Sequence, residues 1–538
     1  MTTVRRDLIG LAFVAALLFV PWLGARDLWN PNEPLYGQAV SEMAARGDWL
    51  VPTVNGSVFD EKPILYFWLA LAASSVLGGV SEAALRIPSA AAGLIAVLLL
   101  YLLVEPYAGS RRARLAGLVL ASTFLVFWSA RQVQMDLLLT ACVLAAVFFA
   151  TRVIDHDSRP SVAWGAVGAA IGAGFLAKGP VGLVCPALVV GTYVIATRRV
   201  RASHLRAIPW AAATFLLVAA PWYLMLWFRG ETGFLAELLY RQNLLRFVEP
   251  WDHGRPWWYF LKYFWIDMAP WSFFLPLAWG LRPADKQEDR LQRLAWSWIF
   301  VIVIFFSFSA SKRSPYILPV APAMAILVAG FAERWLADDC GKWRARLARL
   351  LHAALGLAFA AGGYLLLTGS WIADPPDGLE RPAQLLGATS LVGGLFVLGA
   401  LLARHRRRIL ASAALVGTVG ATYLMASAGV LPAANTFKSH RPLSESIRAR
   451  VAPDQPLRGF HQWRWRASYS FYTGRPIPNI ESREELLEYW AGPEEVFLIV
   501  EQGRLEEVHA ILGPLVPLFA RTVGSNRAYL FSSRDHGE

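Results

Sequence analysis

The chain has 538 residues, of which 56% are hydrophobic and 17% are charged, and its mean hydropathy is +0.41. Soluble globular proteins contain about 45–50% apolar and about 25% charged residues, so the composition argues against a water-soluble enzyme. The net charge of +12 does not by itself indicate nucleic-acid binding, because membrane proteins carry surplus Lys and Arg in cytoplasmic loops. The composition therefore predicts an α-helical polytopic membrane protein.

Apolar runs long enough to cross a bilayer follow one another along most of the chain. A hydrocarbon layer of about 30 Å requires roughly 17–25 residues in a helix. The first run follows Arg5 and Arg6 and lacks a small-residue cleavage site, so we expect an uncleaved helix rather than a signal peptide. We predict thirteen spans, near residues 8–25, 83–104, 115–130, 136–153, 161–177, 181–197, 208–227, 264–281, 295–310, 316–333, 350–368, 384–403 and 409–430.

The distribution of basic residues predicts the side on which each loop lies. In this topology the short loops on one side carry 22 Lys and Arg residues, whereas those on the other side carry five. The basic side is expected to be cytoplasmic. The count requires that the apolar segment Ile64–Gly79 does not cross, so we expect a short helix in the membrane interface. Thirteen spans from a cytoplasmic N-terminus place the C-terminus outside.

The pattern divides the chain into a membrane domain at 1–434 and a second domain at 435–538. The membrane domain has a first external loop at 26–82, with two interfacial helices, and a second large external loop at 228–263. After residue 434 the charged fraction rises to one quarter, the usual value for soluble domains. Helical periodicity and two buried apolar strands in this part predict an α/β domain outside the membrane.

Ionisable residues against the outer membrane surface are the strongest functional candidates, because charges next to a bilayer are costly. They gather in four segments, which contain Glu33, the pair Glu61-Lys62, Asp136 and Lys178. Carboxylates beside lysines suit a reaction on a lipid-linked phosphate, in which a carboxylate activates the nucleophile and a cation neutralises the phosphate leaving group. A transporter would instead place such residues near the membrane midplane.

Each candidate also has a structural interpretation. Glu33 and Asp136 are both placed to stabilise the start of a helix through its dipole. Lys62 is long enough to extend from an interfacial helix to water, and Lys178 lies in a short turn. The four segments together therefore carry more weight than any one residue.

Several motifs closely resemble those of lipid A aminoarabinose transferases. They are Leu28-Trp-Asn-Pro-Asn-Glu-Pro-Leu-Tyr-Gly-Gln, Glu61-Lys-Pro-Ile, Ala84-Leu-Arg-Ile-Pro, Lys178-Gly-Pro, His253-Gly-Arg-Pro-Trp-Trp-Tyr and Ser311-Lys-Arg-Ser-Pro-Tyr-Ile-Leu-Pro. The wider relatives are protein O-mannosyltransferases and other GT-C glycosyltransferases that use polyprenyl-phosphate sugars. The resemblance covers residues 1 to about 330, and it implies a GT-C-like fold with the active site on the periplasmic face of a bacterial inner membrane.

The activity implied by this resemblance is transfer of 4-amino-4-deoxy-L-arabinose from undecaprenyl phosphate to a lipid A phosphate. The expected partners are the lipid-linked donor, the lipid A acceptor and membrane lipid, with no nucleic acid and no assigned oligomeric state. The alternative is a transferase of the same fold acting on a protein hydroxyl, which requires a general base. An acceptor phosphate is already anionic and needs little base, so the carboxylates would then hold the ammonium group of the aminosugar.

The resemblance also implies roles for single residues. The first-loop motif of the family usually ends in Asp-Glu, but here it is Asn32-Glu33, so the catalytic role falls on Glu33 or Asp136. Lys62 and Arg255 are expected at the donor phosphate, and Arg offers a bidentate fork for it. The other expected substrate contacts are Asn32, Tyr36, Glu61, Lys178 and His253.

No cofactor or metal ligand is assigned from the sequence. His253 with the neighbouring Asp252 is too small a set for zinc, which normally takes three or four protein ligands. A divalent metal stays an open alternative, because some GT-C relatives use one.

Overall fold

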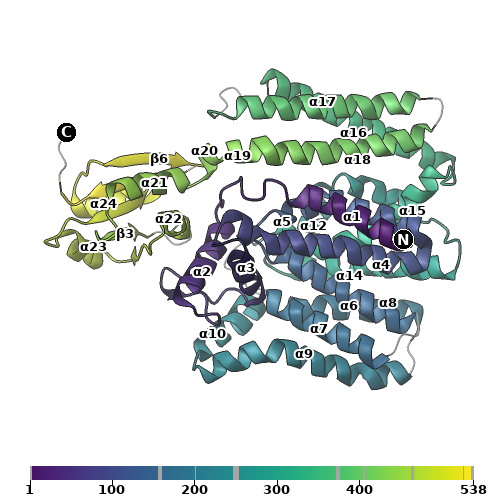
Figure 1. Cartoon of the computed structure of the whole chain (residues 1–538), viewed down its shortest axis with the longest axis horizontal. Helices are drawn as coiled ribbons and strands as arrows, with labels where there is room; N and C mark the ends of the chain where they lie inside the picture. Colours follow the sequence, from purple (N-terminus) through teal and green to yellow (C-terminus); the bar gives the residue numbers. More distant parts are fainter. Residues whose placement is uncertain are drawn as a thin grey trace.

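Long helices packed side by side form most of the molecule, with a small sheet at one end of the bundle (Figure 1). The structure, a computed structural model, describes residues 3–155, 160–199, 202–245, 254–370, 376–403, 406–461, 466–524 and 526–534. Within these ranges, nine helical segments are long and apolar enough to cross a membrane. The protein is therefore a multi-pass membrane protein. These segments are Glu82–Ser122, Asp136–Ile154, Pro160–Lys178, Arg206–Phe228, Lys286–Phe308, Ser314–Leu336, Lys342–Thr368, Glu380–Leu402 and Arg407–Ala433.

The helices of the first half include two shorter apolar ones, α3 and α8. In chain order the elements are α1 (Thr3–Phe19), α2 (Asn32–Arg46), the strands β1 (Thr53–Val54) and β2 (Ser57–Val58), α3 (Leu65–Val76), α4 (Glu82–Ser122), α5 (Phe124–Ala130), α6 (Asp136–Ile154), α7 (Pro160–Lys178), α8 (Val181–Thr197), α9 (Ala202–Phe228), α10 (Thr232–Ala236) and the π-helix η1 (Glu237–Leu245).

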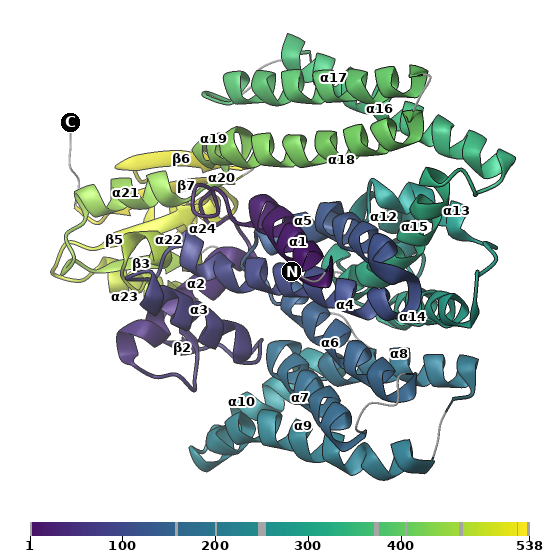
Figure 2. The same ribbon diagram turned by 45° about the vertical axis from the view of Figure 1, so that its right-hand side comes forward.

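The second half of the membrane part is also helical. Its elements are α12 (Tyr259–Asp267), the 3₁₀ helix η2 (Trp271–Phe274), α13 (Leu275–Ala278), α14 (Lys286–Phe308), the 3₁₀ helix η3 (Ser314–Val320), α15 (Ala321–Leu336), α16 (Lys342–Thr368), α17 (Glu380–Leu402), α18 (Arg407–Met425), the π-helix η4 (Ala426–Val430), α19 (Leu431–Ala433) and α20 (Asn435–Lys438). Figure 2 shows α16, α17 and α18 along one edge of the bundle and α7 and α9 along the opposite edge.

Helix α4 contains a reversal of the chain rather than one long straight rod. Gly109 has a φ of 77° and a ψ of 167°, a left-handed conformation that glycine adopts without steric cost. Tyr101 and Arg114, on either side of Gly109, both contact Asp7 of α1, at 3.1 and 3.0 Å. The two halves of α4 therefore run in opposite directions and match the separate spans predicted at 83–104 and 115–130.

The span predicted at 264–281 is wrong as a single helix. Helix α12 ends at Asp267, and two short helices, η2 and α13, follow it. Pro270 lies in the interruption, where its missing N–H prevents a continuous helical hydrogen-bond ladder. The apolar run suggested one element, but its prolines divide it into three.

A mixed five-stranded sheet with helices follows residue 440. The strand order is β4-β3-β5-β7-β6, with β3 parallel to β4 and β5, and β7 antiparallel to β5 and β6. The apolar strand β5 lies at the centre, and buried clusters cover both faces of the sheet. The elements are α21 (Arg441–Arg450), β3 (Leu457–Phe460), α22 (Arg466–Thr473), β4 (Asn479–Ile480), α23 (Arg483–Trp490), β5 (Phe497–Glu501), the 3₁₀ helix η5 (Gln502–Arg504), α24 (Leu505–Leu512), β6 (Phe519–Val523) and β7 (Asn526–Ser532).

The segment that links α1 to α2 is held by residues that follow the last span. The Asn435 side-chain oxygen accepts a hydrogen bond from the Asp27 backbone N–H at 3.0 Å. The Tyr472 hydroxyl oxygen accepts one from the Leu28 N–H at 2.6 Å. Arg441 forms an ion pair with Asp27 at 3.1 Å. These contacts join two parts of the chain that lie more than 400 residues apart.

Candidate functional site

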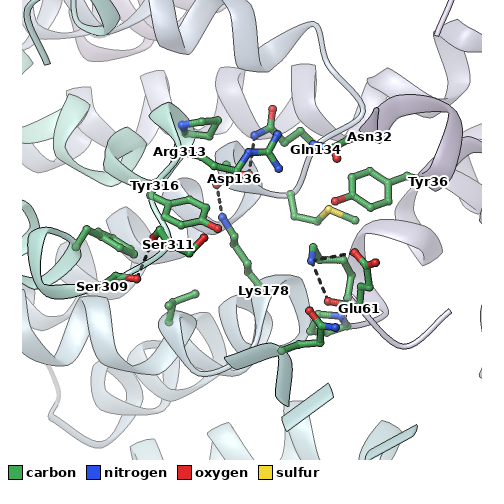
Figure 3. A pocket seen from close by; sticks show the side chains of 17 residues that line it. Asn32, Tyr36, Glu61, Gln134, Asp136, Lys178, Ser309, Ser311, Arg313 and Tyr316 are labelled. Atoms are coloured by element: carbon green, nitrogen blue, oxygen red, sulfur yellow. Dashed lines mark hydrogen bonds and ion pairs between the residues drawn. The ribbon is translucent and has the colours of Figure 1, made fainter. Parts of the chain in front are cut away.

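A cavity of about 120 Å³ lies where the segment containing α2 and α3 meets the ends of α6, α7 and α14 (Figure 3). Six of the nine residues proposed from the sequence line it, namely Asn32, Tyr36, Glu61, Lys62, Asp136 and Lys178. The remaining wall residues are Pro63, Gln134, Met135, Val181, Gln242, Phe306, Ser309, Ser311, Arg313, Pro315 and Tyr316.

Helix ends bring a carboxylate and an ammonium group together in this cavity. Asp136 is the first residue of α6 and Lys178 the last of α7, where a negative and a positive charge each complement the helix dipole. The Lys178 ammonium forms an ion pair with Asp136 Oδ1, and Gln134 Nε2 donates to Asp136 Oδ2 at 2.7 Å. Lys178 Nζ also lies 4.7 Å from the centre of the Tyr316 ring. Both carboxylate oxygens of Asp136 therefore already have partners.

The Glu61-Lys62 pair lies just before α3, on another wall of the cavity. Lys62 Nζ donates to the Glu61 backbone oxygen at 2.9 Å and lies 4.0 Å from Glu61 Oε2. The Lys62 side chain is 17% exposed and that of Glu61 is 24% exposed. The Lys62 ammonium group therefore lies on the cavity wall next to the Glu61 carboxylate.

Arg313 is a wall residue to which the sequence analysis assigned no role. Figure 3 shows it beside Asn32 and Gln134. With the Asn32 amide oriented so that its oxygen faces the guanidinium group, that oxygen lies 2.8 and 3.1 Å from the two terminal nitrogens of Arg313. A neutral amide therefore faces Arg313, and the Asp136 carboxylate on the same cavity wall is close enough to interact with its charge. The available signal was the Lys312-Arg313 pair, which falls on the side predicted to be external, where basic residues are few.

Lys312 supports the cavity wall from behind. Its ammonium group donates to the backbone oxygens of Ser309 and of Arg255, the latter at 3.1 Å. Burial lowers the pKa of Lys312. Residue 254 also forms an isolated antiparallel bridge with Ser311, so the segment before α12 is fixed to this wall by backbone contacts.

Glu33 does not line this cavity, and its proposed catalytic role does not fit its surroundings. The residue is 2% exposed. Its carboxylate accepts hydrogen bonds from Arg26 at 2.6 and 2.9 Å and from Arg86 at 2.9 and 3.1 Å. The backbone N–H groups of Trp29 and Val133 add two more, at 3.2 and 3.0 Å. Every acceptor position of the carboxylate is occupied, so a role of Glu33 as a base would require one of these contacts to break.

Helical geometry explains why neighbouring residues 32 and 33 differ. At 3.6 residues per turn, consecutive side chains of α2 point about 100° apart, so Asn32 faces the cavity and Glu33 the interior. Burial alone would raise the pKa of Glu33, but the charges of Arg26 and Arg86 outweigh burial and lower the pKa to about 2. The sequence did not reveal this because Glu33 and Arg86 are 53 residues apart.

These residues form what we call the Glu33 cluster, which consists of Arg26, Glu33, Arg86 and Arg131. Arg26 donates to the backbone oxygen of Arg131 at 3.1 Å, and Arg131 donates to backbone oxygens at the end of α1 and just after it. Burial and the two neighbouring arginines lower the pKa of Arg131 to about 10. The cluster thereby joins the start of α2 to the loop before α6, which are two walls of the cavity.

Besides Glu33, Arg255 is a predicted residue that does not line the cavity. The Arg255 side chain is exposed and does not line it, although the Arg255 backbone contacts Lys312 behind the wall. His253 lies outside the described residues. The phosphate-binding role of Arg255 and the substrate contact of His253 therefore stay predictions.

A divalent metal does not fit the residues of the cavity. The two carboxylates on its walls are Glu61 and Asp136, and Asp136 already pairs with Lys178. Across the described parts of the chain, no group of three or more His, Cys, Asp or Glu residues is arranged to hold a metal ion. We therefore derive no step through a metal.

Comparisons with known proteins place this geometry in a family. Residues 61–225 match the family model described as dolichyl-phosphate-mannose-protein mannosyltransferase. The undecaprenyl phosphate-alpha-4-amino-4-deoxy-L-arabinose arabinosyl transferase of Edwardsiella ictaluri is 30% identical over 424 residues, covering 76% of this chain and 75% of that protein. The transferase of the same name from Pectobacterium carotovorum is 27% identical over 468 residues, covering 84% and 82%.

Solved structures agree with this assignment at the level of the fold. ArnT from Cupriavidus metallidurans bound to undecaprenyl phosphate superposes with a TM-score of 0.79 at 19% identity, and 98% of each chain is covered. Its apo structure gives a TM-score of 0.78 at 20% identity. The coverage, the helical architecture and the polar cavity agree with one another. The chain belongs to the family of undecaprenyl phosphate-aminoarabinose arabinosyl transferases and is a glycosyltransferase.

Proposed function

We propose that the chain transfers 4-amino-4-deoxy-L-arabinose from undecaprenyl phosphate to a phosphate group of lipid A, at the periplasmic face of a bacterial inner membrane. The observation that carries this proposal is the cavity that holds Lys62, Lys178 and Arg313 opposite two carboxylates. One of these carboxylates is paired with Lys178, so the walls carry a surplus of positive charge. Such a surplus at the ends of apolar helices suits the phosphate of a membrane lipid.

The reaction places its chemical demand on the leaving group. An oxygen of the acceptor phosphate attacks the anomeric carbon of the sugar while the bond from that carbon to the donor phosphate oxygen breaks. The bonding electrons move to the donor phosphate, which leaves as undecaprenyl phosphate. The attacking oxygen is already anionic, so no proton must be removed. Catalysis then depends on positioning and on cations that stabilise the developing phosphate charge.

Lys62 and Arg313 are the cations that we assign to the lipid phosphates. Both side chains line the cavity, with Lys62 beside Glu61 and Arg313 beside Asn32, so both present positive charge to a lipid phosphate bound there. The Asp136–Lys178 pair shapes the wall between them and directs the Lys178 ammonium group into the cavity. Arg255 stays a candidate second phosphate ligand, since its backbone is fixed next to this wall.

The topology belongs to the same proposal. Thirteen passes, with the N-terminus in the cytoplasm and residues 435–538 as a periplasmic α/β domain, put the cavity on the periplasmic side. A C-terminal alkaline phosphatase fusion should be active in cells, and a C-terminal fluorescent protein should be dark. The opposite pair of results would reverse every side assigned above.

Lipid A analysis tests the function directly. The chain would be produced in cells that make the lipid-linked aminosugar but lack their own transferase, and lipid A would be measured by mass spectrometry. We expect one or more aminopentose groups on lipid A with the native chain, and none with a Lys62→Ala variant present at equal level in the membrane. Unmodified lipid A together with newly glycosylated protein would instead support a protein acceptor.

A further inference from the structure

A second cavity, of about 310 Å³, adjoins the first. The two share four wall residues, Asn32, Gln134, Arg313 and Pro315. Sites for small molecules commonly measure about 300–1,000 Å³, so the second cavity is large enough for one sugar. Asp267 lies in its wall, at the end of α12.

Asp267 is a buried carboxylate with an unsatisfied atom. The residue is 7% exposed, and its Oδ2 atom has no hydrogen-bond partner within the part of the chain that the structure describes. Leaving a buried carboxylate oxygen unpaired is costly, and such groups normally have a partner. An ionisable residue inside an otherwise apolar segment is itself a marker of a binding site. The Ser314 side chain lies within hydrogen-bonding reach of the carboxylate, so what Oδ2 lacks is a further donor, which the described residues do not supply.

The other carboxylates around the two cavities already have cationic partners. Glu33, which also borders the second cavity, is held by two arginines, and Asp136 is held by Lys178. Glu61 has Lys62 as its neighbour. Asp267 differs from these three carboxylates because no Lys or Arg of the described residues forms an ion pair with it. A bound cation would therefore compensate its charge. Phe124, Leu125 and Trp128 form an apolar wall of the same cavity, against which the C–H face of a sugar ring can pack.

We propose that Asp267 binds the ammonium group of the donor sugar and selects an amino group over a hydroxyl group at that position. The inference rests on the proposed function, since it specifies how the same site recognises its donor. The phosphate lies in the first cavity with Lys62, the sugar extends past Arg313 into the second, and its ammonium group reaches Asp267. An ammonium group supplies both the positive charge and the N–H donors that Oδ2 lacks.

The main experiment compares two donors that differ at one atom. KM and kcat would be measured for the purified full chain in nanodiscs, with undecaprenyl-phosphate-linked 4-amino-4-deoxy-arabinose and with the matched donor that carries a hydroxyl group at C4. We expect Asp267→Asn to raise KM for the amino donor about tenfold or more, because a charge-assisted contact is lost. KM for the hydroxyl donor should change less than about twofold. Equal changes with both donors, or no change with either, would overturn the proposal.

A matched variant controls for the loss of any buried carboxylate. Asp7 is 5% exposed and is held by Tyr101 and Arg114 away from both cavities. Asp7→Asn should affect the two donors alike. Asp267→Glu, which keeps the charge, should retain part of the preference for the amino donor. If Asp7→Asn changed the preference as Asp267→Asn does, the effect would not be specific to this site and the proposal would fail.

A binding measurement separates this inference from the proposed function. The melting temperature of the protein would be followed with methyl 4-amino-4-deoxy-arabinoside and with methyl arabinoside. Stabilisation by the amine that disappears in Asp267→Asn would support the site even if the native chain transferred no aminosugar, a result that would contradict the proposed function alone. The absence of any difference between the two glycosides would overturn the inference.

The same ammonium chemistry occurs in the headgroup of phosphatidylethanolamine. The kinetic comparison would therefore be repeated in nanodiscs with and without this lipid. We expect the preference for the amino donor to be the same in both. A defect of Asp267→Asn that appears with both donors and requires phosphatidylethanolamine would assign the site to the lipid headgroup and overturn the proposal.

Discussion

Glu33, in the Glu33 cluster, and Asp136, in the Asp136–Lys178 pair, both lie at the start of a helix, but their surroundings differ. Both begin or nearly begin a helix, and both follow a short polar loop. Glu33 accepts hydrogen bonds from two arginines and two backbone N–H groups, and it faces the interior. Asp136 lines the first cavity and forms an ion pair with Lys178, whose side chain also lines it. The partners around a carboxylate, rather than its motif, determine what it does.

The largest expected effect is at Lys62, the lysine that we assign to the donor phosphate. Lys62→Ala should lower kcat/KM about 10²–10³-fold, because a donor that stabilises developing charge is removed. Lys62→Arg should recover part of the rate, since a planar fork does not replace a compact ammonium group. Steady-state kinetics at equal amounts of folded protein would measure both. Near-native activity of Lys62→Ala would leave this lysine only an interfacial role.

The next largest effect is expected at Asp136, whose carboxylate lines the first cavity. Asp136→Asn should lower kcat/KM about 10²-fold, because Lys178 loses the charge that directs it. Thermal unfolding should change less than in a variant of Glu33, since both groups of the Asp136–Lys178 pair remain partly open to the cavity. Full activity of Asp136→Asn would show that the ion pair stabilises helix ends and takes no part in transfer.

Glu33→Gln should give the opposite pattern. Removing one charge of a fully buried network leaves Arg26 and Arg86 uncompensated, which typically costs about 3–5 kcal/mol. We expect a lower melting temperature and a lower yield, with transfer per folded molecule within about threefold of the native value. A variant with native stability and no transfer would restore the catalytic role that the sequence first indicated.

The pH dependence of stability sharpens the same contrast. The pKa of Glu33 is lowered from 4.5 to about 2 in the folded protein. A lowered pKa means that its contribution to stability is complete above about pH 4.5 and is lost as the pH falls through about 2. Melting temperatures between pH 5 and 2 should therefore fall less steeply in Glu33→Gln than in the native chain, whereas equal slopes would show that Glu33 contributes nothing to this dependence.

The smallest expected effect lies outside both regions. Tyr472→Phe removes one hydrogen bond to the Leu28 N–H and should lower the free energy of unfolding by about 1 kcal/mol. Transfer should fall slightly, since Leu28 precedes the segment that positions Asn32. Melting temperature and transfer rate measure the two effects. A loss of transfer as large as that of Asp136→Asn would place the C-terminal sheet in the reaction itself.

The sequence predicted local features better than long-range ones. Apolar length identified most spans, and the positive-inside pattern kept the short helix α3 from being counted as one of them. Lys62, Asp136 and Lys178 were found because each lies next to a span end or an interfacial helix on one predicted side. The ion pairs of Glu33 were not predicted, because its partner Arg86 is distant in sequence and because helical phase separates Glu33 from Asn32.

Arg313 and Asp267 were missed for a related reason. Each is a single charged residue in or beside an apolar segment, and its importance appears only when cavity walls from several segments are assembled. The break after Asp267 was also hidden, because hydropathy counts Pro270 without registering the hydrogen bond that it removes. Which charged groups pair with one another, and which line a cavity, depends on the folded chain. Composition and residue spacing therefore do not predict them.

The contacts of Asn435, Arg441 and Tyr472 with Asp27 and Leu28 also set an order of assembly. Synthesis proceeds from the N-terminus, so the segment before α2 emerges hundreds of residues before the groups that bind it. In the proposed topology these groups must also cross the membrane before they can dock. In that topology one wall of the cavity lacks these contacts throughout the interval, and the cavity is complete only after the end of the chain has been exported.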